Sequence, residues 1–457
     1  MLRRDSDMTS GPIFSQLFSF SMPMMVGLLF QLMYSTVDSI VVGNYVGKTA
    51  LAAVNATVNI IGTLVSFVSS LSVGTGVVVA QCWGARDERN LKTAVSTTFG
   101  LTLVFSLVVT GAGILLVRPM LNLMATPGDV YQEAQVYLTI YFAGIAGSFL
   151  YNMGSAILRA VGDSTRPLLF LIFAAIVNTV LDLLFVIRFE WGVAGVAWAT
   201  VIAQFLSAVL VLFVLTREPR SYGLRWKAIR IEKAMTWRIL RVGLPSAIQS
   251  TIVSFSNVFV QSYINYFGSD NMAAWGCYIK CDHMLGLPSQ AISMGVATFV
   301  GQNVGAGNLK RAGKGVTTAL TMSFLSTLAV GIGVALLRYP IMGLFTQPQD
   351  TEVVRLGVEY LLYIAPFYTI HGLNGVEAAA LRCVDRAKGP MYVYVGSLVV
   401  FRQIYLYAIS HWFGGVLHTE LAIGCAFPLG WTVATLSMTL VYLFSPLGCW
   451  YKEKGKR

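Results

Sequence analysis

The sequence predicts an all-α integral membrane protein, with twelve transmembrane helices arranged as two six-helix bundles. Composition, the length of the apolar runs and an internal repeat lead to this fold class. Of the 457 residues, 56% are hydrophobic and 12% are charged, and the mean hydropathy is +0.68. Soluble domains carry about 25% charged residues, so this chain has too few charges to cover a surface in water. We therefore expect most of its surface to face lipid.

The apolar runs lie along the whole chain and are separated by short polar or basic segments. Most are about 20 residues or slightly longer, the length at which a helix crosses the roughly 30 Å hydrocarbon layer of a bilayer. We expect membrane spans at residues 14–40, 51–80, 94–117, 135–158, 167–187, 192–216, 242–266, 273–300, 316–337, 356–381, 389–410 and 421–445. The polar start of the chain contains no signal-peptide pattern, so we expect the first span to be retained.

The basic residues predict how the spans are oriented. If the amino terminus is cytoplasmic, the loops after even-numbered spans and the tail YKEKGKR lie on the same side, and only seven of the 32 Lys and Arg residues fall on the other. This asymmetry follows the positive-inside rule. It predicts a multi-pass protein of the cell membrane with both termini in the cytoplasm. Topology thereby explains the net charge of +11, and we expect no nucleic-acid partner.

The cysteines and histidines indicate neither a metal centre nor a disulfide framework. The six Cys residues lie in or beside the spans, without the spacing of a zinc ribbon or of a secreted disulfide-bonded protein. The four His residues form no HExxH motif and no close ligand pair. We expect buried free thiols, no resident metal and no cofactor.

The two halves of the chain repeat each other. LRAVGDSTRP (158–167) returns as LRCVDRAKGP (381–390), and Pro23 in FSMP returns as Pro245 in VGLP. Two further pairs have nearly the same offset: CWGARDERNLKTA (82–94) with NVGAGNLKRAGKG (303–315), and RPMLNLMATPGD (118–129) with YPIMGLFTQPQD (339–350). Four anchors in the same order indicate a duplicated six-helix unit.

The duplication predicts three segments: a bundle at 1–216, a basic cytoplasmic linker at 217–241 and a second bundle at 242–457. The Lys and Arg residues of the linker would also allow contact with anionic lipid. Because each bundle has an even number of spans, both enter the membrane from the same side, as parallel repeats do. We expect a V-shaped pair of bundles around a central cavity. Bundles that rock about such a cavity are typical of transporters.

Two polar residues interrupt the apolar run FAAIVNTVLDLLFVI (173–187). Asn178 and Asp182 are four residues apart, so they share one face of a helix. A charged side chain near mid-membrane costs roughly 2.5–3.5 kcal/mol and survives mainly where it faces water or the protein interior. Counted at helical rise from the ends of their spans, Asp182 and Thr200 reach nearly the same depth, in the outer half of the membrane.

The first span adds a third helix to this polar set. In PMMVGLLFQLMYSTVD (23–38), Gln31, Tyr34 and Asp38 recur at i, i+3 and i+7, on a single helical face. Two nearby carboxylates suit a proton, and a set of carboxylate, amide and hydroxyl oxygens suits a hard cation such as Na⁺. We predict a site for H⁺ or Na⁺ formed by Asp38, Asn178, Asp182 and Thr200.

The second half carries a different polar set, formed by Lys280, Asp282, His283, His371, Asn374 and Glu377. Glu377 is about 7.5 Å from Arg382 at helical rise, which favours an intrahelical or interfacial pairing of the two. His371 has two interpretations. It is either a packing residue or a residue that handles protons or contacts cargo.

Several motifs resemble those of a known family. ALAAVNA (50–56), AQCWGARD (80–87) with its second copy GQNVGAGN (301–308), and LRAVGDSTRP (158–167) resemble motifs of the multidrug and toxic compound extrusion (MATE) transporters. The resemblance covers about residues 12–446. It implies a cation-coupled antiporter that expels amphipathic, often cationic, organic compounds.

The resemblance is to the prokaryotic branch that has a cation site in the amino-terminal half. It implies that H⁺ or Na⁺ binds at residues matching that branch's first, fifth and sixth helices, which here are Asp38, Asn178, Asp182 and Thr200. It also implies that Pro23 lets the first helix bend when Asp38 is neutralised. Another branch has an Asp in its tenth helix where this chain has His371, which argues against a Na⁺ site in the second half.

We predict a secondary active efflux pump that works by alternating access. Cargo would enter the central cavity from the cytoplasm or inner leaflet, and cation binding would reset the pump. A pocket for flat amphipathic molecules needs aromatic faces and a few polar groups. The candidate cargo contacts are Gln31, Tyr34, Asn152 and His371. We expect small amphipathic substrates, the lipid bilayer as surroundings and a monomer.

Two other functions are alternatives. A flippase for a lipid-linked or other amphipathic lipid would need a strongly basic cavity, and the membrane interior offers chiefly Lys280. A membrane-embedded acyl or glycosyl transferase would need a catalytic acid or base. His411 and His418 with Glu420 are the cluster to consider, but no nucleophile or donor-binding loop accompanies them. We therefore do not expect an enzyme.

Overall fold

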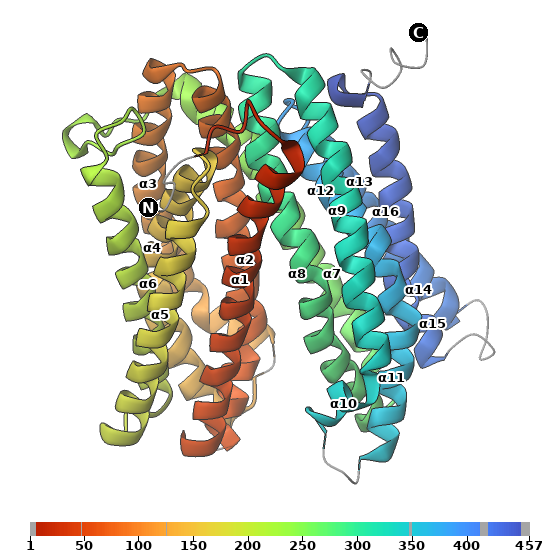
Figure 1. Cartoon of the computed structure of the whole chain (residues 1–457). Helices are drawn as coiled ribbons and strands as arrows, with labels where there is room; N and C mark the ends of the chain where they lie inside the picture. Colours follow the sequence, from red (N-terminus) through yellow and green to blue (C-terminus); the bar gives the residue numbers. More distant parts are fainter. Residues whose placement is uncertain (1–5, 47, 125, 347–349, 412–418, 449–457) are drawn as a thin grey trace. The chain divides into compact units, whose positions relative to one another are not determined.

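The structure is a computed structural model that describes residues 6–46, 48–124, 126–346, 350–411 and 419–448. The elements of this part of the chain are helices (Figure 1). Within these residues, eleven helical stretches, some of which join two or three consecutive elements, are long and apolar enough to cross a membrane. The remaining predicted span is the more polar helix α7 (Lys233–Asn265). The prediction of an all-α membrane protein is therefore confirmed.

The first half of the chain forms the helices α1 (Ile13–Val41), η1 (Val42–Val46), α2 (Lys48–Gly84), α3 (Glu88–Leu123), α4 (Gly128–Ala160), α5 (Thr165–Leu183), η2 (Leu184–Arg188) and α6 (Gly192–Arg217). The linker contains η3 (Trp226–Ala228). The second half forms α7, α8 (Ser269–Gly305), α9 (Leu309–Leu336), α10 (Arg338–Gly343), α11 (Thr351–Ile364), η4 (Ala365–Phe367), α12 (Tyr368–Arg382), α13 (Lys388–Val395), η5 (Gly396–Phe401), α14 (Arg402–His411), α15 (Glu420–Gly424) and α16 (Ala426–Leu443).

Packing divides the chain into two compact units. Unit 1 comprises Met1–Asp7 and Met22–Ala247, and unit 2 comprises Met8–Ser21 and Ile248–Arg457. The first helix of each half thus begins in the unit of the other half. Pro23 and Pro245 lie close to the two positions at which α1 and α7 pass between units. These packing units are not the same as the predicted sequence repeats. The division into bundles at 1–216 and 242–457 with a linker at 217–241 stays a prediction.

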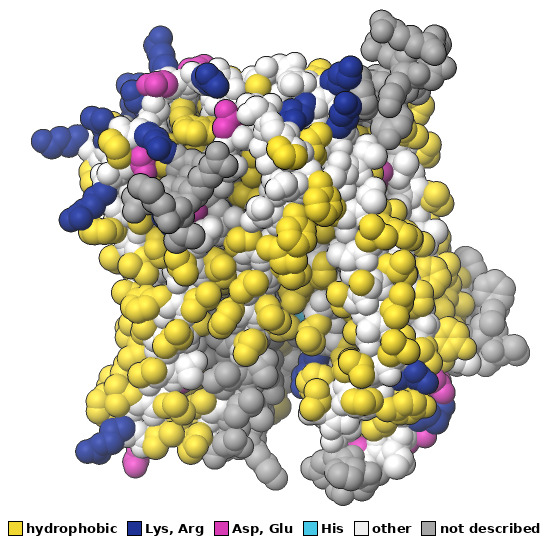
Figure 2. Space-filling model, viewed as in Figure 1, with side chains coloured by type: hydrophobic (Ala, Val, Ile, Leu, Met, Phe, Trp, Pro, Cys, Tyr) yellow, Lys and Arg dark blue, Asp and Glu magenta, His cyan; other side chains and the backbone are white. Residues whose placement is uncertain are grey.

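In unit 1, α4 packs against α2, α3 and α6. A hydrophobic cluster joins these helices through buried side chains such as Val79, Phe99, Leu158 and Val211. Figure 2 shows hydrophobic side chains over the middle of the helices of unit 1 on the face in view, with Lys and Arg near the helix ends. This distribution is the one that a hydrocarbon layer between two polar interfaces favours.

The basic linker folds onto unit 1. Tyr222 is fully buried, and its ring meets that of Trp83 edge to face, with 5.6 Å between centroids. The backbone N–H of Arg230 donates to the Ser96 hydroxyl of α3 at 2.9 Å. Burial raises the pKa of the Tyr222 hydroxyl. The buried side chains of the linker thus belong to the hydrophobic core of unit 1.

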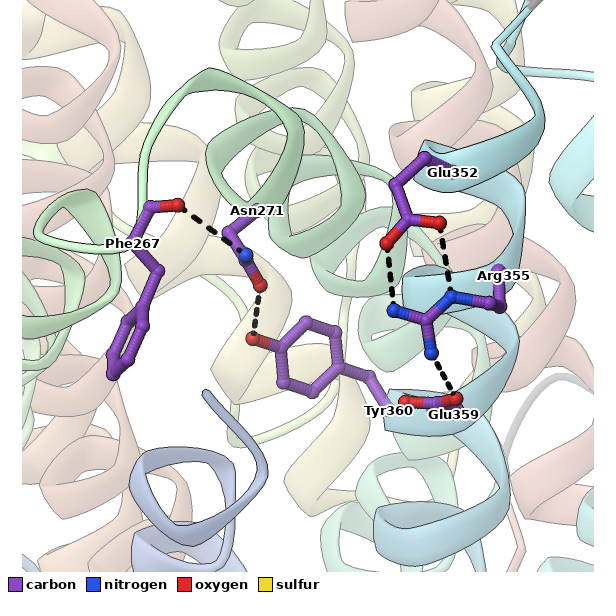
Figure 3. Close-up of polar contacts among 6 residues, drawn as sticks. All are labelled: Phe267, Asn271, Glu352, Arg355, Glu359 and Tyr360. Carbon is purple, nitrogen blue, oxygen red and sulfur yellow. Dashed lines mark hydrogen bonds and ion pairs between the residues drawn. The ribbon is translucent and has the colours of Figure 1, made fainter. Parts of the chain in front are cut away.

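In unit 2, α12 packs against α8, α9 and α16, and α11 packs against α8. The Tyr360 hydroxyl of α11 donates to Asn271 Oδ1 of α8 at 3.1 Å (Figure 3). On the exposed face of α11, Arg355 pairs with Glu352 and Glu359 along the helix (Figure 3). Residues 8–21 also belong to this unit: the backbone N–H of Met8 donates to Gln302 Oε1 at 2.9 Å.

The repeated loop motifs have the same local geometry in both halves. Arg86 (φ 54°) and Gly307 (φ 74°) adopt the left-handed conformation just after α2 and α8. The following residues cap the next helices: Asp87 Oδ1 accepts from the N–H of Asn90, and Asn308 Oδ1 from that of Arg311, both at 3.0 Å. A left-handed residue followed by an N-cap is a common way to end one helix and begin another, which explains why these motifs recur.

Candidate functional site

The polar residues predicted on α5 and α6 are buried in unit 1. Asn178 is 2% exposed, Asp182 is 0% exposed and Thr200 is 8% exposed, and the two helices pack against each other. The Thr200 hydroxyl donates to the carbonyl oxygen of Val196 at 3.0 Å. Its proton is thereby used within the helix, while the oxygen keeps a lone pair that can accept a hydrogen bond or coordinate a cation.

The Asn178 amide is the clearest sign of a ligand site in unit 1. Neither its Nδ2 nor its Oδ1 has a hydrogen-bond partner among the residues that the structure describes. A buried polar group without a partner costs about 1–3 kcal/mol, and such groups usually indicate water, an ion or a functional role. The amide fits a cation site, because Oδ1 is a hard oxygen ligand and Nδ2 can bind a water molecule that accompanies the ion.

The helices that carry the predicted carboxylates end in the same irregular way. α1 passes into the π-helical segment η1 shortly after Asp38, and α5 passes into the π-helical segment η2 shortly after Asp182. Such segments are rare and are frequent at functional sites. η1 and η2 pack against each other and against α6. The backbones of all three predicted site helices therefore meet next to these residues.

A hydrophobic cluster surrounds this meeting point. It contains Val41 and Val42 from the end of α1 and the start of η1, Val186 from η2, and Val193 and Val196 from α6. All of these side chains are buried. A cation placed here would be shielded from lipid and bulk water, so its binding energy would have to come from the nearby oxygen ligands.

Other predicted residues of the first half are placed only in part. The side chains of Tyr34 and Asp38 lie outside the described residues. Gln31 is half-buried on α1, and Asn152 uses its Nδ2 to donate to the carbonyl oxygen of Ser148 at 2.9 Å, within α4. Their assignment to the cation or to cargo stays a prediction.

The polar residues of the second half make local contacts within unit 2. Lys280 Nζ lies over the ring of Phe345 at 5.0 Å, and Asp282 Oδ1 accepts from the Tyr278 hydroxyl at 3.0 Å. His371 is half-buried and packs against Trp431, with 4.8 Å between ring centroids and an angle of 30° between the ring planes. This placement fits a packing role for His371, and its cargo role stays a prediction.

The interpretation of Glu377 as a partner of Arg382 is wrong. The Glu377 carboxylate is 3% exposed and accepts from the Thr439 hydroxyl of α16, at 3.0 and 3.1 Å to its two oxygens. Arg382 Nη2 instead donates to Gln249 Oε1 of α7 at 3.2 Å. Residues five apart in a helix point about 140° away from each other, so the two side chains reach different neighbours.

Arg402 was not predicted as a functional residue; it is one of the seven basic residues that the positive-inside pattern places on the outer side. The structure buries Arg402 at 1% exposure between α14, α7 and α16. Its Nη2 donates to Ser256 Oγ at 2.7 Å and to Asn257 Oδ1 at 2.8 Å. The available signal was a single Arg in the middle of an otherwise apolar span.

One of the residues considered for a transferase, His411, ends α14. His411 stacks on Tyr407, with 4.3 Å between ring centroids, and His418 lies outside the described residues. Within the described part of the chain, no group of three or more His, Cys, Asp or Glu side chains could hold a metal ion.

Membrane-length helices packed around buried polar side chains define a multi-span membrane protein with an internal polar site. The chain belongs to the MatE family, whose model matches residues 23–184 and 245–407 and so covers both halves. The predicted family is thereby confirmed.

Individual relatives match along nearly the whole chain. The probable multidrug resistance protein YpnP of Bacillus subtilis (strain 168) is 29% identical, over 96% of both chains. The FAD transporter of Shewanella oneidensis is 24% identical, over 91% of this chain and 92% of its own. A solved structure described as the outward-facing conformation of a MATE family transporter matches with a TM-score of 0.89 at 21% identity, covering 95% of this chain and 96% of its own. This likeness establishes the fold.

Proposed function

We propose that the protein exports amphipathic, often cationic, organic compounds across the cell membrane in exchange for H⁺ or Na⁺. The observation that carries the proposal is the buried set of Asn178, Asp182 and Thr200, with an amide that lacks a partner in the described structure. The printed name of the Bacillus subtilis relative, a probable multidrug resistance protein, supports export of several compounds.

The proposed mechanism follows from the cost of burying a carboxylate. An ionised carboxylate in an apolar interior is strongly unfavourable unless a cation or a proton neutralises it. A state in which Asp182 is closed off from water is therefore favoured when the site holds H⁺ or Na⁺, and an open, hydrated state is favoured when it does not. Cargo that binds one state better than the other would be coupled to the cation by this difference alone.

Pro23 provides a place at which α1 can bend. Proline has no N–H, so the carbonyl group of Ser19 lacks its usual helical donor. Residues before this point pack in unit 2, and residues after it pack in unit 1. A bend here would move the Asp38 end of α1 relative to its start, which links the cation site to the proposed alternation. We expect the transporter to be a monomer with both termini in the cytoplasm.

The test is efflux of a fluorescent cationic dye from proteoliposomes with an imposed Na⁺ or pH gradient. We expect dye movement to follow one of the gradients in the wild type and to be lost in Asp182→Asn. Asp270→Asn, which removes an exposed carboxylate at the start of α8, is the matched control and should transport normally. Coupled transport that survives Asp182→Asn would exclude this site, and absence of dye movement under both gradients would favour the flippase alternative.

An anionic cargo is a second candidate. The Shewanella oneidensis relative is named an FAD transporter, and FAD joins flat aromatic rings to a pyrophosphate. The observation in this chain that favours such a cargo is the buried guanidinium of Arg402 in unit 2.

A further inference from the structure

Helix α7 carries a polar stripe along one face. The stripe consists of residues spaced i, i+4, i+7, i+11 and i+15, which are Ser250, Ser254, Asn257, Gln261 and Asn265. Residues with this spacing lie on one side of a helix. Asn257 and Asn265 are exposed, and Gln261 donates to Asn265 Oδ1 at 2.8 Å. Amides that face hydrocarbon would lose their hydrogen bonds to water, so the stripe indicates a face of unit 2 that meets water inside the membrane.

Arg402 lies directly behind this stripe. Its Nη2 donates to Asn257 Oδ1 at 2.8 Å and to Ser256 Oγ at 2.7 Å. Because Asn257 is exposed while Arg402 is 1% exposed, a single amide side chain separates the guanidinium from the polar face. A rotation of that side chain would give a ligand access to the cation.

The guanidinium has no counterion among the residues that the structure describes. No carboxylate in the described part of the chain lies within ion-pair distance of Arg402, and its buried Nε has no acceptor there. Arg355 shows the usual arrangement in the same unit, since it pairs with Glu352 and Glu359 (Figure 3). A buried cation that neutral oxygens satisfy only in part would bind an anion favourably, because the anion supplies the missing charge and acceptors.

The surroundings hold the guanidinium in place. Its Cζ lies 5.0 Å from the ring centroid of Phe427, which packs in turn against Trp275 and Trp431. On the other side, the Ser256 hydroxyl that accepts from Arg402 donates to the carbonyl oxygen of Leu398 at 2.9 Å. A donor fixed in this way loses little conformational entropy when it binds a ligand.

We propose that Arg402 and Asn257 of the α7 stripe form a binding site for the anionic group, a carboxylate or a phosphate, of an amphipathic cargo molecule. The planar fork of N–H groups matches both anions in a bidentate manner. The Asn257 amide turns aside and hydrogen-bonds the same anion, and Gln261 extends the polar face toward the end of α7. The inference rests on the proposed export function for the identity of the ligand as cargo, but binding itself is measurable without transport.

The test compares two dyes that share one ring system and differ in charge. Fluorescein is anionic, and tetramethylrhodamine methyl ester is cationic. The full-length protein is placed in phosphatidylcholine nanodiscs, and both affinities are measured for the wild type and the variants. Asn257→Asp puts a carboxylate on Arg402, and we expect it to weaken fluorescein binding by about tenfold or more, because the new carboxylate competes for the same donors. The cationic dye should bind no more weakly than before.

The matched control is Asn265→Asp, which adds the same charge to the same stripe two turns away from Asn257. It should change the affinity for fluorescein by less than about twofold, because exposed charges at this separation are largely screened. Arg402→Gln should lose fluorescein binding as Asn257→Asp does. Since Asn257 is exposed, its variant tests the site even if the Arg402 variant does not fold. Equal fluorescein affinities in the wild type and in Asn257→Asp would overturn the proposal.

Nanodiscs that contain phosphatidylglycerol distinguish two sources of the bound anion, a lipid headgroup and a free compound. If this lipid weakens fluorescein binding to the wild type but not to Asn257→Asp, the site also accepts a lipid phosphate. If it has no effect, the site selects free compounds, and both results support an anion site. If wild-type protein in proteoliposomes does not export tetramethylrhodamine methyl ester, the proposed export function is contradicted. The nanodisc measurement of fluorescein binding does not depend on that result.

Discussion

Gly74 of α2 lies against Gly243 of α7 with no room for a side chain between them. A Cβ on Gly74 would lie 2.7 Å from the backbone nitrogen of Gly243, and a Cβ on Gly243 would lie 2.6 Å from the carbonyl oxygen of Leu71. At the repeat-equivalent place in unit 2, a Cβ on Gly295 of α8 would lie 2.7 Å from Ser21 Oγ of α1. The first part of α7 therefore packs directly against α2, and the first part of α1 packs directly against α8. In both cases the first helix of one half contacts the second helix of the other half.

The first prediction concerns this close contact. Gly74→Ala should lower the free energy of unfolding by about 1–3 kcal/mol, because backbone atoms cannot move aside as a flexible side chain can. Gly76→Ala is the matched control on the same helix, since its Cβ would meet nothing closer than 3.9 Å. It should be neutral or stabilising by up to about 1 kcal/mol, because alanine is the better helix former. Thermal unfolding in detergent measures both, and equal effects of the two substitutions would contradict the packing described here.

The second prediction concerns Pro245, which occupies the place in α7 that Pro23 has in α1. Proline inside a helix costs about 3 kcal/mol and permits bending. Pro245→Ala should therefore keep or raise the thermal unfolding temperature while lowering the initial rate of dye efflux several-fold. Pro288→Ala in the middle of α8, a helix that lies within unit 2 over its whole length, is the control and should leave the rate close to that of the wild type. An efflux rate unchanged by Pro245→Ala would show that α7 does not bend there during transport.

Much of the fold could be predicted from hydropathy, and the exceptions have a physical cause. The expected span at 242–266 is part of α7, which begins earlier, at Lys233. Arg238 and Arg241 made this stretch look like linker. It is helical because it packs on unit 1 rather than on lipid, and hydropathy does not record which surface a helix meets.

The candidate site was predictable in its residue types but less so in its contacts. A carboxylate and an amide on one helical face predicted a buried polar set, and the structure buries both Asn178 and Asp182. The π-helical segments η1 and η2 were not predictable, since a change of hydrogen-bond register leaves no mark in the hydrophobic pattern. The importance of Arg402 was also hidden, because its partners on α7 are far away in the sequence.

The third prediction uses the paired caps of the repeat. Asn308→Ala should lower the free energy of unfolding by about 1 kcal/mol, with little dependence on pH, because an amide does not titrate. Asp87→Ala should behave differently. Hydrogen bonds from Asn90 hold the pKa of the Asp87 carboxyl below its ordinary value of 3.8. Its stabilising effect is therefore present above that value and is lost as the pH falls through the lowered pKa.

Thermal unfolding of the wild type and of both cap variants across acidic and neutral pH tests this pair. The difference between the wild type and Asp87→Ala should shrink as the pH falls through the carboxyl titration, while that for Asn308→Ala stays constant. Parallel pH profiles for the two variants would show that the Asp87 carboxylate does not stabilise the start of α3.

The fourth prediction concerns the buried carboxylate of Glu377. Thr439→Val removes its hydroxyl donor and should destabilise the protein by about 1–3 kcal/mol, which is the cost of leaving a buried acceptor unsatisfied. Thr439→Ser keeps the hydroxyl and should cost less. If the cost comes from the carboxylate, Thr439→Val should be milder in a Glu377→Gln background, as a double-mutant cycle measures. Additive effects of the two substitutions would mean that Thr439 stabilises unit 2 in some other way.

The fifth prediction separates stability from function at the candidate cation site. Asn178 is buried without a hydrogen-bond partner in the described structure, so it lowers the stability of unit 1. Asn178→Leu keeps the number and branching of the side-chain heavy atoms and removes the unsatisfied amide, and we expect it to raise the free energy of unfolding by about 1 kcal/mol or more. The same change removes an oxygen ligand and a water-binding donor, so cation-driven efflux should fall by at least about tenfold. Unfolding and efflux are measured on the same preparation, with Asn152→Leu as the control for the unfolding measurement, because the Nδ2 of Asn152 is already bonded within its own helix. A variant that is less stable than the wild type, or one that is more stable and still pumps normally, would show that the Asn178 amide is not held ready for a cation.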